Sequence, residues 1–281
     1  MKIAVTGASG FVGRHVLQVL ALSKDVQVVA ASRRAADASW LPAGMAHVAI
    51  DMGGPVEDAF RRLGEPDAVI HLAWDGLPNY RARHHFETQL PEQYRFLRQL
   101  AESGLRSLVC AGTCFEYGMR SGELDENLVP DPSNPYGFAK DALRRELQFL
   151  AADTGLALTW ARLFYMYGEG QAPGSLYSQF IAASKRGDAE FAMSGGEQLR
   201  DFLHVRDVAR YLVTLALLHA GAGVVNVCSG TPTSVRSLVE GWRETYQMPM
   251  KLVLGHFPYP SYEPMAFWGR NAKLQQLMGA M

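Results

Sequence analysis

Six short apolar runs lie along the first 163 residues, and each is followed by a segment long enough for a helix. The runs are KIAVTG, VQVVAAS, AHVAID, DAVIHLA, SLVCAG and ALTWARL. Strands that alternate with helices are typical of βαβ units, whose strands join one parallel sheet. Several runs are almost wholly apolar, as expected where helices cover both faces. The pattern predicts an α/β fold with a doubly wound parallel sheet.

The alternation fades after about residue 165, where Gly, Pro and aromatic residues become frequent. The segments YGEGQAPGSLYSQF and GHFPYPSYEPMAFWG are typical of loops around a pocket. We therefore expect a smaller lobe built onto the sheet.

Length, charge and cysteine content bound the class of protein. The 281 residues can bury a substantial core, and the formal charge of −1 argues against nucleic acid or a membrane surface as partner. The cysteines at 110, 114 and 228 form no CxxC pair, which suits a reducing compartment. The N-terminus lacks a signal-like apolar segment, and YLVTLALL at 211–218 is far shorter than the ~20 residues of a membrane helix. We expect a cytoplasmic protein.

The first apolar run leads into TGASGFVG, where glycines are spaced three apart before a helix-like segment. Such a turn lets the backbone approach a pyrophosphate closely, and the helix N-terminus offers free N–H groups to the anion. A glycine-rich turn without a ligand is the alternative. We predict a dinucleotide site with contacts from Gly7, Ser9, Gly10, Phe11, Val12 and Gly13.

The second apolar run ends at Ser32, Arg33 and Arg34. An acidic residue at about this position binds the ribose 2′-hydroxyl in many NAD sites, and no carboxylate stands here. Because a guanidinium can hold a phosphate through paired hydrogen bonds, we predict that NADP(H) is preferred and that NAD(H) is possible. Two solvated arginines on a loop are the alternative. Asp51, after the third run, is expected to contact the adenine amine.

A tyrosine and a lysine lie four positions apart in NPYGFAK, behind Pro135. Proline is tolerated in the first turn of a helix, so Tyr136 and Lys140 are predicted on one helix face, ~6 Å apart. An ammonium ~4 Å from a phenol, at an effective dielectric of ~20, supplies the roughly 4 kcal/mol that lowers the phenol pKa from ~10 to neutrality. Desolvation acts the other way, so the positive ring of an oxidised nicotinamide is expected to help.

Thr113 directly follows the fifth apolar run, in AGTCFEYG. Its hydroxyl can donate to a substrate oxygen that lies beside the phenol. A threonine that only caps a loop is the alternative. Thr113, Tyr136 and Lys140 are the predicted catalytic residues.

Together these residues resemble the extended short-chain dehydrogenase/reductases, in the branch that acts on nucleotide-activated sugars (the NAD-dependent epimerase/dehydratase family). The resemblance runs through TGASGFVG, AID at 49–51, VIHLA at 69–73, GTCFEYG, NPYGFAK, RLFYMYG, RDFLHVRDVA and VNVCSGTPTSV. It implies a Rossmann domain over residues 1–165, to which part of 200–228 returns, and a smaller C-terminal substrate lobe over 166–199 and 229–281.

The resemblance also assigns roles to single residues. It carries the family's catalytic group onto Thr113, Tyr136 and Lys140. The last two are also expected to contact the cofactor, with further contacts from Met52, Leu72, Ala73 and Trp74. Substrate contacts are expected from Thr113, Cys114, Phe115, Tyr165 and Arg200.

Several positions depart from the family pattern. In the sugar 4,6-dehydratases an Asp-Glu pair after the threonine removes water across C5 and C6, and here Cys114 and Phe115 stand instead, which argues against dehydration. Tyr165 replaces a common asparagine, and Trp74 puts a bulky ring where a small residue is usual, which should narrow the sugar pocket. Arg200 matches an arginine that commonly binds the diphosphate, with a salt bridge to a nearby aspartate, 201 or 207, as the alternative.

Three functions compete at this point. The first is NADPH-dependent reduction of the C4 keto group of a nucleotide-activated 4-keto-6-deoxy sugar, with Tyr136 as proton donor. The second is a 4-epimerase of a nucleoside-diphosphate hexose with retained NAD. The third is a non-catalytic sensor or scaffold that binds NAD(P), against which the intact Thr-Tyr-Lys set argues.

Two further expectations concern partners. The predicted helices over 87–103 and after Tyr136 are long and partly apolar, and in this family such a pair commonly packs against its mate, so we expect a homodimer. His84, His85 and His204 have no third ligand at a metal-site spacing, so no metal is predicted.

Overall fold

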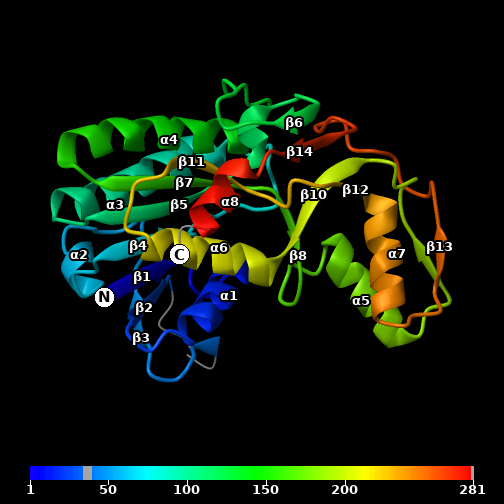
Figure 1. Cartoon of the computed structure of the whole chain (residues 1–281), viewed down its shortest axis with the longest axis horizontal. Helices are drawn as coiled ribbons and strands as arrows, with labels where there is room; N and C mark the ends of the chain where they lie inside the picture. The colour runs from blue at the N-terminus through cyan, green and yellow to red at the C-terminus, as the bar shows by residue number, and fades with distance from the viewer. Residues whose placement is uncertain (34–39, 280–281) are drawn as a thin grey trace.

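A seven-stranded parallel sheet lies at the centre of the larger part of the molecule (Figure 1). The computed structural model describes residues 1–33 and 40–279. The strand order is β11-β7-β5-β4-β1-β2-β3, with β1 (Lys2–Thr6), β2 (Gln27–Ser32), β3 (Ala46–Ala49), β4 (Ala68–His71), β5 (Ser107–Thr113), β7 (Ala157–Leu163) and β11 (Gly223–Val227). The six strands predicted from the apolar runs are all present, and the order reverses beside β1, as in a doubly wound fold.

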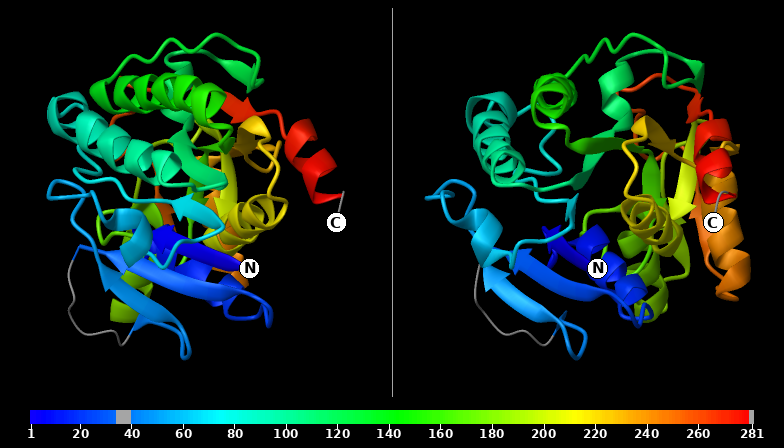
Figure 2. Two further views of the ribbon diagram at one scale, coloured as in Figure 1. Left: turned by 90° about the vertical axis from the view of Figure 1, so that its left-hand side faces the viewer. Right: turned by 60° about the vertical axis from the view of Figure 1, so that its left-hand side comes forward.

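Helices cover both faces of this sheet (Figure 2). On one face lie α1 (Phe11–Leu20) and α6 (Val205–Leu217), and on the other lie α2 (Ala59–Arg62), α3 (Leu90–Glu102) and α4 (Pro135–Thr154). Their apolar sides bury residues such as Leu17, Phe96 and Leu143 completely against the strands. Burial of each such side chain stabilises the fold by ~1.5–3 kcal/mol, so the amphipathic pattern decides which face each helix presents. The predicted Rossmann-like α/β fold is confirmed.

The helix predicted over 87–103 begins differently from a regular helix. A π-helical turn, η2 (His85–Gln89), precedes α3, and Pro91 stands in the first turn of α3. This turn carries two buried polar side chains, His85 and Gln89, toward the end of β4.

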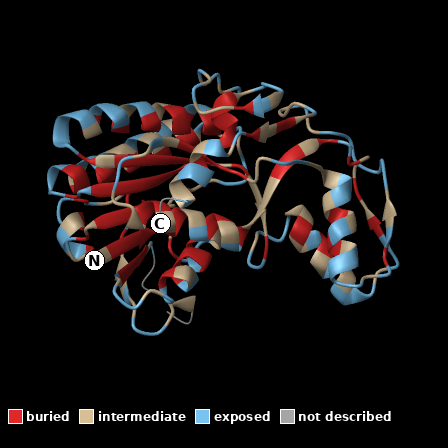
Figure 3. Ribbon diagram, viewed as in Figure 1, coloured by how far each residue is buried: buried red, intermediate tan, exposed pale blue. Residues whose placement is uncertain are grey.

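Smaller sheets and two helices lie beyond the carboxyl ends of the main strands (Figure 1). Their strands are β6 (Gly122–Leu124), β8 (Tyr165–Tyr167), β9 (Glu190–Ala192), β10 (Leu199–His204), β12 (Pro232–Ser234), β13 (Lys251–Val253) and β14 (Phe267–Gly269). The helices α5 (Leu176–Arg186) and α7 (Val235–Thr245) pack around a separate core that contains Phe180 and Trp242 (Figure 3). A last helix, α8 (Ala272–Met278), lies beside β11. The chain thus leaves the main sheet after β7 and returns with α6 and β11; the domain limits drawn from the sequence stay a prediction.

Within the residues that the structure describes, no helix is both long and apolar enough to cross a membrane.

Candidate functional site

The glycine turn places the N-terminus of α1 at the carboxyl edge of the sheet. Gly10 is the N-cap residue, and no side chain of the described residues caps it. A Cβ on Gly13 would meet the carbonyl oxygen of Gly7 and lie 2.8 Å from the Ala8 Cα, so only glycine lets the helix pack this closely on the turn. Gly7 itself has a φ of 67° and lies against the backbone that follows β4. Free N–H groups in such a cradle fit a pyrophosphate.

The other predicted cofactor residues gather at the same edge. Ser9 is exposed, and Phe11 and Val12 are half-buried at the start of α1. After β3, Asp51 is exposed and Met52 is buried. The residues Leu72, Ala73 and Trp74, which follow β4, are half-buried beside the turn.

Arg33, one of two arginines predicted to select NADP(H), is paired at the end of β2. Its guanidinium lies 2.9 Å from the Asp75 carboxylate, and the two side chains are 65% and 48% exposed. Because exposed pairs contribute ~0–1 kcal/mol, a phosphate can compete for this guanidinium. Ser32 lies beside it, with its hydroxyl 2.9 Å from Nε2 of His47, and Arg34 lies outside the described residues.

Thr113 and Tyr136 meet where two helices begin side by side. Thr113 is the N-cap of a short 3₁₀ helix, η3 (Cys114–Tyr117), and Asn134 caps α4 by accepting a hydrogen bond from the Gly137 N–H at 2.9 Å. A Cβ on Gly137 would lie 2.5 Å from the carbonyl oxygen of Phe115, so glycine at this position lets α4 approach η3. The close approach brings the Tyr136 phenol near the Thr113 side chain.

The environment of Tyr136 favours the protonated phenol. Burial raises its pKa above the ordinary value, the neighbouring Tyr80 and Glu116 add to the rise, and the nearby Thr113 side chain lowers it. The sequence predicts that Lys140 lowers the pKa of this phenol; in the protein alone the prediction is wrong, because desolvation raises that pKa. The group is poised as an acid that gives up its proton only when a further positive charge or an acceptor arrives.

Lys140 lies one helical turn after Tyr136 and is 2% exposed. Its Nζ donates a hydrogen bond to the Ala111 carbonyl oxygen at 2.9 Å and lies 3.9 Å from the centre of the Trp74 ring. Burial lowers the pKa of this ammonium to about 8, and Cys110 and Glu116 act in the opposite direction. Lys140 is therefore still mostly charged at neutral pH.

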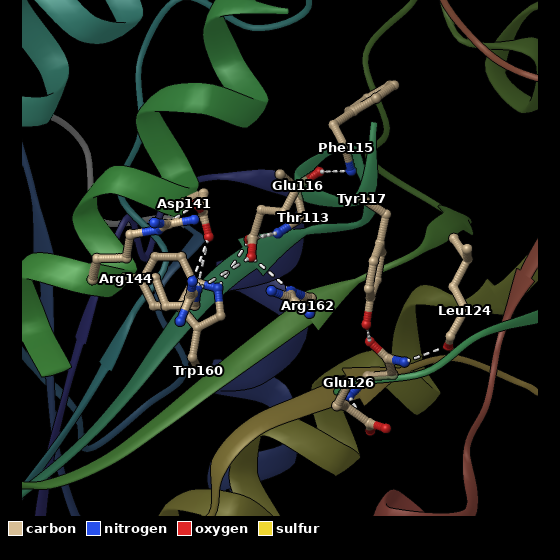
Figure 4. Close-up of polar contacts among 12 residues, drawn as sticks. Thr113, Phe115, Glu116, Tyr117, Leu124, Glu126, Asp141, Arg144, Trp160 and Arg162 are labelled. Atoms are coloured by element: carbon tan, nitrogen blue, oxygen red, sulfur yellow. Dashed lines mark hydrogen bonds and ion pairs between the residues drawn. The ribbon is translucent and has the colours of Figure 1, made fainter. Parts of the chain in front are cut away.

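A buried ionic cluster that the sequence analysis missed supports Thr113 from behind (Figure 4). Glu116 is fully buried; its Oε1 accepts from the Thr113 N–H at 2.8 Å and from Trp160 Nε1 at 2.9 Å. Its Oε2 accepts from Arg162 Nε at 2.6 Å. Arg144 lies 4.0 Å away and pairs with Asp141. We call Glu116, Asp141, Arg144, Trp160 and Arg162 the Glu116 cluster; its local signal is the capping-box pattern Thr-x-x-Glu.

A cavity of about 440 Å³ opens beside the predicted catalytic residues, lined by residues 78–81, Asn134 and residues 259–262. The Tyr80 ring forms part of its wall and lies 5.6 Å from the Tyr136 ring and 4.8 Å from the Phe115 ring. Cys114 is buried behind this wall. The Phe115 ring packs between these tyrosines, 6.3 Å from the Tyr136 ring, whereas Cys114 belongs to a core cluster.

Arg200 on β10 and Tyr165 on β8, both predicted to contact substrate, lie together, with the guanidinium 5.9 Å from the centre of the Tyr165 ring. The Arg200 Nη2 lies 2.8 Å from the Glu263 carboxylate, and these side chains are 3% and 8% exposed. The partner is therefore Glu263 and neither of the two aspartates that the sequence offered. Burial and the Glu263 carboxylate raise the pKa of Tyr165 well above its ordinary value.

The described residues contain no group of three or more His, Cys, Asp or Glu side chains placed to hold a metal ion. His71 is fully buried at the end of β4, where burial, and then the charge of Lys140, lower its pKa to about 3. Its Nδ1 lies 2.9 Å from the Thr6 hydroxyl. His85 is also fully buried and contacts Trp74.

Comparisons with known proteins agree with this geometry. A model of the NAD dependent epimerase/dehydratase family matches residues 3–228. The chain is 30% identical to the dTDP-6-deoxy-L-talose 4-dehydrogenase (NAD(+)) of Aggregatibacter actinomycetemcomitans, over 96% of this chain and 99% of that protein. It is 28% identical to the GDP-6-deoxy-D-mannose reductase of Pseudomonas aeruginosa, over 99% and 91%.

Solved structures show the same likeness. MoeE5 in complex with UDP-glucuronic acid and NAD superimposes with a TM-score of 0.81 at 29% identity, over 99% of this chain and 93% of that one. The matched family segment contains the glycine turn, Thr113, Tyr136 and Lys140, which are the features that carry the resemblance in the sequence. The chain belongs to the NAD dependent epimerase/dehydratase family.

Proposed function

We propose that the chain reduces the C4 keto group of a nucleotide-activated 4-keto-6-deoxy sugar, with NADP(H) as cofactor. The observation that carries the proposal is the buried Tyr136 beside Thr113, at the sheet edge where the glycine cradle lies. A bound NADPH supplies the hydride that C4 accepts. Tyr136 gives its phenolic proton to the sugar O4, and the Thr113 hydroxyl donates a hydrogen bond to the same oxygen. Lys140 stabilises the phenolate that remains until solvent returns the proton.

The residues after Thr113 support reduction over dehydration. Cys114 is a buried thiol with a raised pKa, and Phe115 has no titratable group, so neither can serve as the acid or base that removes water. The names of two relatives, a 6-deoxy-talose 4-dehydrogenase and a 6-deoxy-mannose reductase, both describe redox chemistry on a 6-deoxy sugar, and the first places it at C4. The apolar rings of Phe115 and Tyr80 suit a methyl group at C6.

The preference for NADP(H) rests on Arg33 and on the lack of a carboxylate at the end of β2. Asp75 must release Arg33 when a 2′-phosphate binds, at a cost of ~0–1 kcal/mol. One relative is named as an NAD(+)-dependent dehydrogenase and MoeE5 is in complex with NAD, so NAD(H) is the alternative. The dissociation constants of NADPH and NADH, measured side by side, decide which cofactor is preferred. Tighter binding of NADH would contradict this part of the proposal.

Arg200 reaches a substrate diphosphate only by exchanging the Glu263 carboxylate for phosphate oxygens. Removal of that competing charge should favour the diphosphate. We therefore expect Glu263→Gln to bind a nucleoside diphosphate more tightly than the unchanged protein in calorimetry. Weaker binding would mean that Glu263 itself contacts the nucleotide sugar and that Arg200 positions it.

A 4-epimerase with retained NAD is the second candidate, because curated UDP-glucose 4-epimerases also match most of the chain. Turnover with sugar nucleotides separates the two reactions. A reductase consumes NADPH in proportion to product, whereas an epimerase interconverts the C4 isomers with no net change in cofactor absorbance. Incubation with dTDP- and GDP-linked 4-keto-6-deoxy sugars, followed by NMR of the products, tests both.

Substitution of Tyr136 tests whether the chain is an enzyme at all, against the alternative of a sensor or scaffold. We expect Tyr136→Phe to lower kcat by ~10²–10⁴-fold, because the proton donor is lost, and to leave the NADPH dissociation constant unchanged. Tyr246→Phe, at a 40% exposed tyrosine after α7, is the matched control. Full activity of Tyr136→Phe would contradict the mechanism, and no turnover of any sugar nucleotide by the unchanged protein would favour the sensor.

We also infer a cytoplasmic homodimer that packs through α3 and α4. Phe138 and Phe149 on α4 are 52% and 75% exposed, which is unusual for such large apolar rings outside a contact. The three cysteines are free and buried, which suits a reducing compartment. Light scattering at micromolar concentration should give the dimer mass, and the double variant Phe138→Lys/Phe149→Lys should give the monomer mass.

A further inference from the structure

Trp74 stands at a position where the resemblance leads us to expect a small residue, and its ring covers the catalytic lysine. The Lys140 Nζ lies 3.9 Å from the ring centre, closer than a typical cation–π limit of ~6 Å. A hydrogen bond to the Ala111 carbonyl oxygen is the one such bond that the described structure records for this Nζ. Besides that hydrogen bond, the contact with the face of the Trp74 ring therefore fixes the position of the Lys140 ammonium.

Trp74 is itself fixed by His85. The Trp74 Nε1–H donates to His85 Nδ1 at 3.0 Å, and His85 Nε2 lies 2.8 Å from the Asn79 carbonyl oxygen. Because an indole N–H can only donate, Nδ1 must carry a lone pair, and the imidazole proton must lie on Nε2 and point at Asn79. His85 is neutral in this arrangement, and its burial lowers its pKa in agreement.

We propose that Trp74 is a positioning residue that keeps Lys140 charged and in place beneath Tyr136, with neutral His85 as its anchor. The inference rests on the proposed function, because it assigns Trp74 to the proton-transfer group of that reaction. The Trp74 ring also lies edge-on to the Tyr136 ring at 6.0 Å, so one side chain touches both members of the pair.

The charged and titratable groups around Lys140 show why the ring is needed. Cys110 on β5 and Glu116 on η3 face it and favour its charge, but the Glu116 carboxylate is already paired with Arg162. His71 on β4 and His85 on η2 also face it, and both are neutral. His84 lies beside His85, and Tyr136 lies on the same helix as the lysine.

Burial lowers the pKa of Lys140 to about 8, so the ammonium is close to losing its proton at physiological pH. A cation over an indole is stabilised, and loss of the ring should move that pKa further down by about one pH unit. A phenylalanine keeps a weaker face and loses the hydrogen bond to His85, so it should give a smaller shift in the same direction.

The pKa of Lys140 can be measured without turnover. The full chain has few lysines, so ¹³Cε-lysine NMR separates Lys140 from the reference lysines Lys2, Lys24, Lys185, Lys251 and Lys273. We expect titration near pH 8 in the unchanged protein, about one unit lower in Trp74→Leu, and between the two in Trp74→Phe. The alkaline limb of the kcat profile, measured at saturating cofactor, should move by the same amounts.

Trp40→Leu is the matched control, because Trp40 also contacts a histidine, His47, edge-on at 5.6 Å. It should leave the Lys140 titration unchanged. A Lys140 titration that is the same in Trp74→Leu as in the unchanged protein overturns the inference. Should the leucine variant fail to fold, Trp74→Phe alone decides, and the absence of a downward shift in it has the same meaning. If no nucleotide sugar reacts, the proposed function fails, while the NMR titration still decides the role of Trp74.

Discussion

The glycine turn and the Glu116 cluster both support the predicted active site, and they differ in the groups that form them. The turn offers backbone N–H groups at an exposed helix end, and glycines let other backbone approach it. The cluster consists of buried side chains, with Arg162 and Glu116 at 1% and 0% exposure. The turn therefore depends on the absence of side-chain atoms, and the cluster depends on charges that must remain paired.

This difference predicts which substitutions damage the glycine turn and which damage the Glu116 cluster. A backbone cradle tolerates most changes of charge around it but no added Cβ. A buried ion pair tolerates no loss of one partner, because the other charge is then left in a low dielectric without compensation. The following predictions test this contrast, from the largest expected effect to the smallest.

Loss of the Glu116 charge should be the most damaging change. We expect Glu116→Gln to lower the free energy of unfolding by ~3–5 kcal/mol, because Arg162 keeps its buried charge without a carboxylate. Urea denaturation measures this. Glu87→Gln, which removes an exposed partner of Arg83 at 3.8 Å, should change stability by less than ~0.5 kcal/mol. Equal effects of the two substitutions would contradict the claim that the buried ion pair of Glu116 and Arg162 depends on both of its charges.

Replacement of Lys140 by methionine should stabilise the protein while it removes activity. The folded lysine releases its proton at about 8 and the unfolded one at ~10.4, so the folded state disfavours the ammonium below pH 8. Lys140→Met should therefore be more stable than the unchanged protein by ~3 kcal/mol at pH 7. This difference in stability should become smaller as the pH rises from 8 toward ~10.4, because in that range the unfolded lysine binds more protons than the folded one.

The measurement is the difference in unfolding free energy between Lys140→Met and the unchanged protein at several pH values. Taking the difference cancels the titration of tyrosines and cysteines that the two proteins share. Lys24→Met, at an exposed lysine, is the control and should show no gap. If the difference in unfolding free energy between Lys140→Met and the unchanged protein does not change with pH, the Lys140 ammonium is not destabilised by burial.

An added methyl group at Gly13 should disturb the cofactor side with no change of charge. Its Cβ would overlap the turn backbone, so we expect Gly13→Ala to cost ~1–3 kcal/mol of stability and to weaken NADPH binding at least tenfold. A Cβ on Gly241 in α7 would have nothing within 4 Å, and Gly241→Ala should gain ~0.5–1 kcal/mol. Calorimetry measures NADPH binding and thermal unfolding measures stability in both variants. Unchanged NADPH affinity in Gly13→Ala would contradict the prediction that the glycine turn binds the cofactor.

The smallest effect on stability is expected at Arg33. Because its pair with Asp75 is largely exposed, Arg33→Ala should change the free energy of unfolding by less than ~1 kcal/mol. It should nevertheless weaken NADPH binding by about tenfold and leave NADH binding unchanged, since a lost phosphate contact costs ~1.5–3 kcal/mol. Arg61→Ala, at an exposed arginine paired with Asp58, is the control. An equal loss for both cofactors would show that Arg33 does not distinguish them.

Much of the fold follows from local patterns. The apolar runs predict six strands of the main sheet because buried parallel strands need apolar side chains on both faces. The spacing of Tyr136 and Lys140 predicts their common helix face because helical geometry repeats every 3.6 residues. The pattern Thr-x-x-Glu at Thr113 and Glu116 carries a local capping signal, but it does not reveal the buried arginine that the glutamate meets.

The contacts of the centre do not follow from such patterns. Arg200 pairs with Glu263, which lies 63 positions later, whereas the sequence offered only aspartates close to Arg200. The spacing of His85 in the sequence indicates no ligand role, and it gives no sign that the ring is buried against Trp74.

The amino-acid sequence by itself determined the repeating strand and helix, the backbone cradle and the common helix that carries Tyr136 and Lys140, because these depend on periodicity and on residues close in the chain. Tertiary structure alone decided which side chain covers Lys140, which carboxylate meets Arg200 and how far Tyr136 is desolvated. Those outcomes depend on the packing of segments distant in sequence, since electrostatic strength is set by burial and distance, and neither is encoded in a local pattern.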